Sequence, residues 1–259
     1  ATTTRPPVVV GVDTAHASLT HAAVVAGLAT FDPDVTVAGA ILNRVASPRH
    51  GAEVARGLAQ LGIPVLGQIP RTESIFVPSR HLGLVPAGEW EDSATKVAGL
   101  GGLIAEYVDL DAVMDMAATA PDLDVEPWDP AAALESAGWQ GHPFGESPLV
   151  GMFAGRAFTF RYPETTEMLI AAGFRVVDVD PLTDRRLPDG IQGLYLGGGF
   201  PQMHATDLET NSELADDVRS HAEAGMPIVA ECAGLLYLCR HLDGHEMAGV
   251  LPMDAAMAK

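Results

Sequence analysis

A cysteine between an apolar run and a glycine-containing run has the setting best suited to chemistry. Cys232 lies in "PIVAECAGLLYL", where a strand-like segment meets a helix-like segment. A sharp turn between strand and helix presents a nucleophile at its tip, and a helix start favours the reactive thiolate. The motif predicts that Cys232 is a nucleophile. The alternative is a small cysteine buried in the core.

A nucleophile in such a turn works with backbone N–H groups that bind the oxyanion of its intermediate. Ala233 follows the cysteine, and its N–H is one candidate donor. The run "LGGG" offers others, because glycine lets the backbone approach a substrate without a Cβ clash. We expect Gly198 and Gly199, beside Gly197, to supply the second donor.

A cysteine nucleophile also needs a base, which is usually a histidine. This role is assigned to none of the nearby histidines, which are His204, His221, His241 and His245. His221, His241 and His245 are explained more simply as surface residues. Glu231 either orients the turn or contacts substrate, and a helix-capping role is an equal alternative. Cys239, in "LLYLCRHL", is interpreted as a packing residue.

The composition narrows the range of partners. The chain has 259 residues, and 15 Lys and Arg against 34 Asp and Glu give a net charge of -19. Such an excess of acid argues against nucleic acid and anionic membranes as partners, which leaves small molecules. No apolar run approaches the roughly 20 residues that span a bilayer. The two cysteines are too far apart for a mutual disulfide, and unpaired thiols favour the cytoplasm.

The first part of the chain has the pattern of a parallel sheet with crossover helices. Strands are expected at 7–13, 35–45 and 63–71, with helix-like segments between them. The run "PVVVGVD" is continuous in apolar residues, so we expect it to be buried on both faces. A helix is predicted over 92–118, with a break near Asp109. This part is interpreted as a domain over 1–118.

A second α/β unit is predicted for 148–259. Its strands are expected at 149–155, 174–180 and 193–199, with one helix opening near Pro163 and another around 207–224. The stretch 119–147 is rich in Pro, Gly and acidic residues, and it is the best candidate for a linker.

Several long motifs, in this order, carry a family resemblance: "AGAILNRVASPRH", "GIPVLGQIPR", "PSRHLGLVPAGE", "AGRAFTFRYPETTEMLIAAG", "LYLGGGFPQMHATDLETN" and "PIVAECAGLLYL". The chain resembles the cobyrinic (hydrogenobyrinic) acid a,c-diamide synthases, which are glutamine-dependent amidotransferases. The resemblance implies an α/β fold: a partial dethiobiotin-synthetase-like ATP domain with a parallel sheet, then a partial flavodoxin-like class I glutaminase domain. "RHLGLV" and "LYLGGGFPQMHA" favour this family over the similar cobyric acid synthases.

The resemblance also implies a reaction and its participants. ATP, with Mg²⁺, would activate the a and c carboxylates of a corrin-ring substrate, and ammonia from glutamine would convert them into amides. Cys232 matches the glutaminase nucleophile, which forms a γ-glutamyl thioester. Asn43 would read the adenine edge, and Pro70 would border the adenine pocket. From the residues alone, Asn43 is a turn residue that ends a strand.

Three arginines could face phosphate or carboxylate groups, because guanidinium pairs with both: Arg44, Arg71 and Arg80. As isolated arginines, however, such residues are more often solvated or structural. His81, in "RHLGLV", is interpreted as a loop anchor. Asp13 ends a strand but is not interpreted as a metal ligand, and no metal-binding residue is predicted.

The sequence departs from the family pattern at two places. It contains no P-loop, because "PVVVGVDTAHAS" matches a later strand, and the family's catalytic histidine lies beyond "GVLP". We therefore expect a chain truncated at both ends that lacks full activity. A non-catalytic binding or assembly module, and a cysteine hydrolase or chaperone-like protein on the same fold, are the alternatives. The number of assembling chains stays open, with a homodimer as one option.

Overall fold

The computed structural model describes residues 4–72, 92–142 and 147–257. The chain divides into two compact units, unit 1 (Ala1–Glu126) and unit 2 (Pro127–Lys259), and each is described by itself. Arg80 and His81 lie outside the described residues. Within the described parts, no helix has the length and apolar character needed to cross a membrane.

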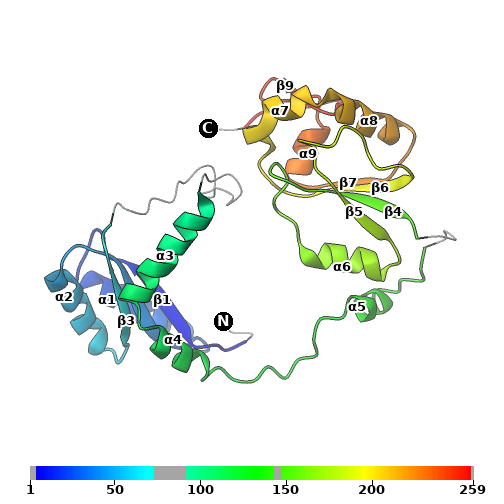
Figure 1. The fold of residues 1–259 in the computed structure, drawn as a ribbon. Helices are drawn as coiled ribbons and strands as arrows, with labels where there is room; N and C mark the ends of the chain where they lie inside the picture. The colour runs from blue at the N-terminus through cyan, green and yellow to red at the C-terminus, as the bar shows by residue number, and fades with distance from the viewer. Residues whose placement is uncertain (1–3, 73–91, 143–146, 258–259) are drawn as a thin grey trace. The chain divides into compact units, whose positions relative to one another are not determined.

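Unit 1 alternates strands with helices, as the sequence predicts (Figure 1). Its elements are β1 (Val8–Asp13), α1 (Thr20–Phe31), β2 (Val37–Val45), α2 (Pro48–Ala59), β3 (Val65–Pro70), α3 (Ser93–Tyr107) and α4 (Leu110–Ala117). The strands form a parallel sheet in the order β1-β2-β3. Because the strands are parallel, their carboxyl ends meet at one edge of the sheet.

The core of unit 1 lies between the sheet and the α1–α2 pair. Val25 of α1 and Val54 and Leu58 of α2 are almost fully buried against Ala40 and Leu42 of β2. The N-terminus of α2 is capped, because the Ser47 side chain accepts a hydrogen bond from the backbone N–H of His50 and Pro48 occupies the first helical turn.

The expectation that β1 is buried on both faces is wrong for the described chain. Val12 is buried, but Val8, Val9 and Val10 are only half-buried and Gly11 is exposed. The reason is topological: β1 is an edge strand of the sheet, with a neighbour on one side only.

The predicted helix over 92–118 does break at Asp109. The Asp109 side chain accepts a hydrogen bond from the backbone N–H of Ala112 at 2.9 Å and so caps α4. Its own N–H donates to the carbonyl of Leu66 in β3 at 2.7 Å. Asp109 therefore starts α4 and joins this start to β3, two residues after α3 ends at Tyr107.

Unit 2 contains the second parallel sheet. Its elements are α5 (Pro130–Ser136), β4 (Leu149–Phe153), α6 (Pro163–Ala171), β5 (Arg175–Val179), β6 (Ile191–Leu196), η3 (Pro201–His204), α7 (Ala205–Thr210), α8 (Ser212–Glu223), β7 (Ile228–Ala230), α9 (Ala233–Leu238), β8 (His241–Leu242), β9 (His245–Glu246) and β10 (Asp254–Ala255). The main sheet has the order β5-β4-β6-β7, and β10-β8-β9 form a small separate sheet.

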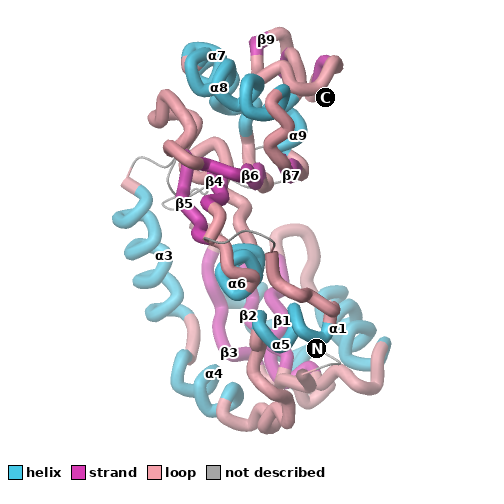
Figure 2. The backbone as a smooth tube through the Cα atoms, turned by 90° about the vertical axis from the view of Figure 1, so that its right-hand side faces the viewer, coloured by secondary structure: helices cyan, strands magenta, loops and turns pink. Residues whose placement is uncertain are grey.

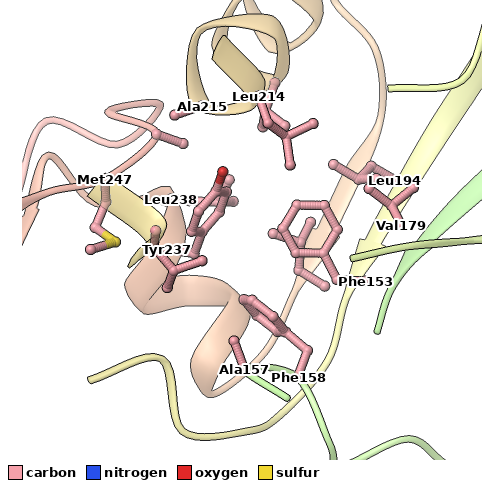
Figure 3. Close-up of a cluster of buried hydrophobic side chains, with 14 of the residues drawn as sticks. Phe153, Ala157, Phe158, Val179, Leu194, Leu214, Ala215, Tyr237, Leu238 and Met247 are labelled. Atoms are coloured by element: carbon pink, nitrogen blue, oxygen red, sulfur yellow. The ribbon is translucent and has the colours of Figure 1, made fainter. Parts of the chain in front are cut away.

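Helices cover both faces of the main sheet. α6 lies on one face, while α8 and α9 lie on the other, and Figure 2 shows the same layers from the side. Between the sheet and α8–α9, aromatic rings pack edge to face (Figure 3). Phe153 of β4 lies 5.0 Å from Phe158 and 5.2 Å from Tyr237, measured between ring centroids. Such aromatic packing fixes α9 against the strand ends.

The helix predicted around 207–224 is divided in two at Asn211. This buried side chain donates hydrogen bonds of 2.7 Å to the carbonyls of Pro181 and Asp184. A helix-internal residue would not reach these partners, so the chain bends between α7 and α8. The bend was not predictable from local spacing, because the two carbonyls lie about 30 residues away.

The predicted linker, 119–147, contains a helix. α5 begins with Pro130, and Asp129 caps it by accepting hydrogen bonds from Ala131 and Ala132. It belongs to unit 2, where it contacts α6. The domain and linker boundaries remain predictions.

Candidate functional site

Cys232 occupies a strained turn between β7 and α9. Its backbone has φ 49° and ψ -111°, a region that side-chain-bearing residues rarely adopt. Such strain costs on the order of 1–3 kcal/mol and is kept only where the surrounding structure enforces it. The thiol is exposed. This is the geometry expected of a nucleophile elbow.

The strained turn is fastened to the glycine run that follows β6. The backbone N–H of Glu231 donates to the carbonyl of Leu196, and that of Gly234 donates to the carbonyl of Gly197, both at 3.0 Å. A Cβ on Gly234 would lie 2.3 Å from the Leu196 carbonyl oxygen, which leaves no room for a side chain. The structure thus brings together the two motifs that carry the predicted nucleophile and oxyanion donors.

The three predicted oxyanion donors differ in their surroundings. Ala233 is the first residue of α9, so its N–H has no carbonyl partner within the helix. Gly198 forms a β-bridge with Phe160, in which the Phe160 N–H donates to the Gly198 carbonyl at 3.1 Å. Gly199 packs so closely on Ala157 that a Cβ would lie 2.1 Å from its carbonyl. The segment around Phe160 therefore borders the site. It lies in the motif "AGRAFTFRYPETTEMLIAAG", for which the sequence predicts no role in the site.

Glu231, directly before the nucleophile, bonds across to β6. Its Oε1 accepts a hydrogen bond of 2.6 Å from the hydroxyl of Tyr195. No side chain caps α9, so the helix-capping alternative for Glu231 is wrong. Burial, together with the Glu231 carboxylate, raises the pKa of the Tyr195 hydroxyl, which therefore stays protonated and donates. Sequence reasoning missed Tyr195, although its position two residues before Gly197 was a signal.

The four nearby histidines are occupied elsewhere or buried. Nδ1 of His221 lies 2.9 Å from the Asp217 carbonyl, His241 pairs with Asp254 and His245 pairs with Glu209, while His204 is buried. His221, His241 and His245 thus each have a hydrogen-bond partner other than the Cys232 thiol.

Cys239 differs from Cys232 in burial and in chemistry. It directly follows α9, is only 2% exposed, and its thiol contacts the Leu235 carbonyl at 3.3 Å. Burial raises the pKa of this thiol. These properties fit its interpretation as a packing residue.

In unit 1, the predicted adenine residues lie at the carboxyl edge of the sheet. Pro70 is the last residue of β3, whereas Asn43 lies inside β2, two residues before its end at Val45. The interpretation of Asn43 as a turn residue that ends a strand is therefore wrong. The Asn43 Oδ1 accepts a hydrogen bond from the Arg44 N–H at 2.9 Å, whereas its Nδ2 donates to no described residue. Thr14 donates twice to the Asn43 carbonyl and fixes its backbone. The exposed amide thus retains a free N–H donor.

Two of the three arginines bond within unit 1. Arg44 forms an ion pair with Asp13 through two hydrogen bonds, which lowers the pKa of the Asp13 carboxyl. Arg71 donates to the Ala15 carbonyl at 3.3 Å. Both therefore have structural partners at the strand ends.

Comparisons with protein families match both units. Residues 13–85 match the CobQ/CobB/MinD/ParA nucleotide binding domain, and residues 150–259 match the CobB/CobQ-like glutamine amidotransferase domain. The fold and the two matches place a nucleotide-binding domain ahead of a glutamine amidotransferase domain in this chain. No solved structure matches the chain.

Curated relatives narrow the class. A hydrogenobyrinate a,c-diamide synthase of Thermobifida fusca is 49% identical over 95% of this chain and 52% of its own length. One from Streptomyces coelicolor is 43% identical over 98% of the chain and 57% of its length. A cobyrinate a,c-diamide synthase of Listeria monocytogenes is 36% identical over 95% of this chain and 53% of its own length. The chain belongs to the family of cobyrinate and hydrogenobyrinate a,c-diamide synthases, and it spans about half the length of these relatives.

Proposed function

We propose that Cys232 is the nucleophile of a glutaminase site that releases ammonia for an amidation reaction. The thiolate attacks the side-chain amide carbon of glutamine, and the resulting oxyanion collapses to a γ-glutamyl thioester with loss of ammonia. Water then cleaves the thioester to glutamate and regenerates the thiol. The observation that carries the proposal is the exposed cysteine at a strained strand-to-helix turn, hydrogen-bonded to a glycine run.

The oxyanion would be held by backbone N–H groups near the thiol. Ala233 is supported by its position at the start of α9, where its N–H lacks a helical partner. Gly198 and Gly199 are supported by the hydrogen bonds that join their run to the elbow. Donors of this kind typically accelerate acyl transfer by 10²- to 10³-fold each.

The ammonia would be used for the ATP-dependent amidation of the a and c carboxylates of cobyrinic or hydrogenobyrinic acid. The names of the relatives support this reaction, and the nucleotide-binding match of residues 13–85 supports the use of ATP. Mg²⁺ belongs to the proposal, because it neutralises phosphate charge in phosphoryl transfer. Glutamine and the corrin-ring acid would be the partners, and the cytoplasm is the proposed compartment.

Asn43 and Pro70 would flank the adenine. The free Nδ2 of Asn43 can donate to a ring nitrogen, and the half-buried Pro70 offers an apolar surface beside it. ATP itself would supply the phosphoryl group that activates a carboxylate for attack by ammonia.

The test separates glutamine hydrolysis from amidation in the full-length protein. Cys232→Ser should abolish amide formation with glutamine as donor but leave amide formation with ammonium chloride within about twofold of the wild type, since free ammonia bypasses the thioester. Cys239→Ser is the matched control, and it should retain the glutamine reaction.

Two results would overturn the proposal. If Cys232→Ser retained glutamine-dependent amidation, another residue would be the nucleophile. If the wild type amidated no corrin carboxylate from either donor, the chain would belong to a binding module instead. Cobyric acid as the product would point to the neighbouring family.

A further inference from the structure

We propose that Glu231 is a specificity-determining residue that binds the α-ammonium group of glutamine, with Tyr195 as the residue that positions its carboxylate. The inference rests on the proposed glutaminase function and adds to it the recognition of the substrate's amino-acid end.

The Glu231 carboxylate has one satisfied and one open oxygen. Oε1 accepts the hydrogen bond from Tyr195, whereas Oε2 has no hydrogen-bond partner within the described residues. In the same residues, no Lys, Arg or His side chain forms an ion pair with it. The side chain is exposed beside an exposed nucleophile. An anchored carboxylate without a cation is an open site for a positive group.

Two tethers hold Glu231 in place. The Tyr195 hydroxyl binds its side chain, and the Leu196 carbonyl binds its backbone N–H at 3.0 Å. Both partners lie in β6, where Leu194 and Leu196 are buried in the core of unit 2. The position of the Glu231 carboxylate relative to the elbow is therefore fixed, so binding a ligand would cost little side-chain entropy.

The chemistry of glutamine matches this arrangement. Its reacting amide is neutral, and its only cation is the α-ammonium group at the opposite end. Glu231 and Cys232 are consecutive and both exposed, so the carboxylate and the thiol belong to the same turn. A hydrogen-bonded charge pair of this kind commonly changes affinity by about 10- to 100-fold.

The test compares two alkylating probes at Cys232 in the full-length protein. The glutamine analogue 6-diazo-5-oxo-L-norleucine carries an α-ammonium group, whereas iodoacetamide does not. Glu231→Gln removes the charge but keeps an acceptor for Tyr195. It should slow labelling by the analogue by about 10- to 100-fold and leave labelling by iodoacetamide unchanged.

Further variants sharpen the result. Tyr195→Phe should slow the analogue less than Glu231→Gln, because the charge remains but its position is no longer fixed. Glu213→Gln, on the exposed surface of α8, removes the same charge elsewhere and should change neither rate.

The outcomes distinguish the proposed role of Glu231 from the proposed glutaminase function on which it rests. Equal slowing of both probes by Glu231→Gln would assign Glu231 a purely structural role, and no effect on either would remove it from the site. Failure of the analogue to label Cys232 in the wild type would contradict the glutaminase function itself, and the inference would fall with it.

Discussion

The carboxyl edges of the two sheets are constructed in different ways. In unit 2, backbone contacts make the edge: glycines leave no room for a Cβ, and a cysteine adopts a positive φ. In unit 1, side chains make the edge: Asp13 pairs with Arg44, and Arg71 binds the Ala15 carbonyl. An edge made by the backbone depends on residue types in fixed order. An edge made by side chains depends on pairs that lie far apart in the chain.

This difference predicts where substitutions are costly. An edge made by the backbone is closely packed, so one added methyl group disrupts it. An exposed ion pair contributes little to stability, because solvent screens it. The expected effects therefore decrease from the elbow of unit 2 to the strand ends of unit 1.

The largest effect is expected from Gly234→Ala. The new Cβ would lie 2.3 Å from the Leu196 carbonyl oxygen, which is backbone and cannot move aside. We expect unit 2 to lose about 3 kcal/mol of unfolding free energy, measured by urea denaturation. Gly193→Ala, in the same β6 strand, is the matched control, because its nearest neighbour lies 3.6 Å away. Equal effects of the two substitutions would show that the elbow is not tightly held.

A smaller change, of opposite sign, is expected from Cys232→Gly. Glycine tolerates the φ of 49°, so strain is relieved, although its greater freedom in the unfolded chain offsets part of the gain. We expect the variant to be about 1 kcal/mol more stable than Cys232→Ser, which keeps the strained Cβ. A Cys232→Gly protein no more stable than Cys232→Ser would mean that the turn is not strained.

The smallest effect is expected from Asp13→Asn. The Arg44 guanidinium lowers the pKa of the Asp13 carboxyl below its ordinary value of 3.8. The pair therefore stabilises unit 1 above that value, and the contribution is lost as pH falls through the lowered pKa. Hydrogen exchange in β1 and β2 should show a small loss of protection in Asp13→Asn at pH 6. That difference should shrink as the pH is lowered below 3.8, and a difference that does not change with pH would exclude the ion pair as its cause.

Much of the fold follows from local sequence patterns. The apolar runs and their spacing predict the strands of both sheets, and the break at Asp109 follows from its capping chemistry. The half-exposed β1 and the bend at Asn211 were not predictable, because edge position and distant carbonyl partners are properties of the assembled sheet. α5 had a local signal, Asp129 followed by Pro130, which the proline-rich surroundings obscured.

The candidate site likewise has one part that the sequence predicts and one part that only the structure reveals. Cys232, Ala233 and the glycines lie on two motifs that a strand-turn-helix pattern makes recognisable, and the structure joins the motifs through Gly234 and Gly197. The Tyr195–Glu231 pair and the Phe160–Gly198 bridge link residues 36 and 38 positions apart, respectively. No spacing rule connects such residues, so only the folded structure places them beside the nucleophile.

The most direct test of the central claim is to map where 6-diazo-5-oxo-L-norleucine reacts in the full-length protein. Peptide mass spectrometry should find the adduct on the exposed Cys232 and not on the buried Cys239. Saturating glutamine should protect Cys232 from the reagent. Labelling of Cys239 at the same rate, or undiminished labelling of the protein after Cys232→Ser, would contradict the assignment of Cys232 as the glutaminase nucleophile.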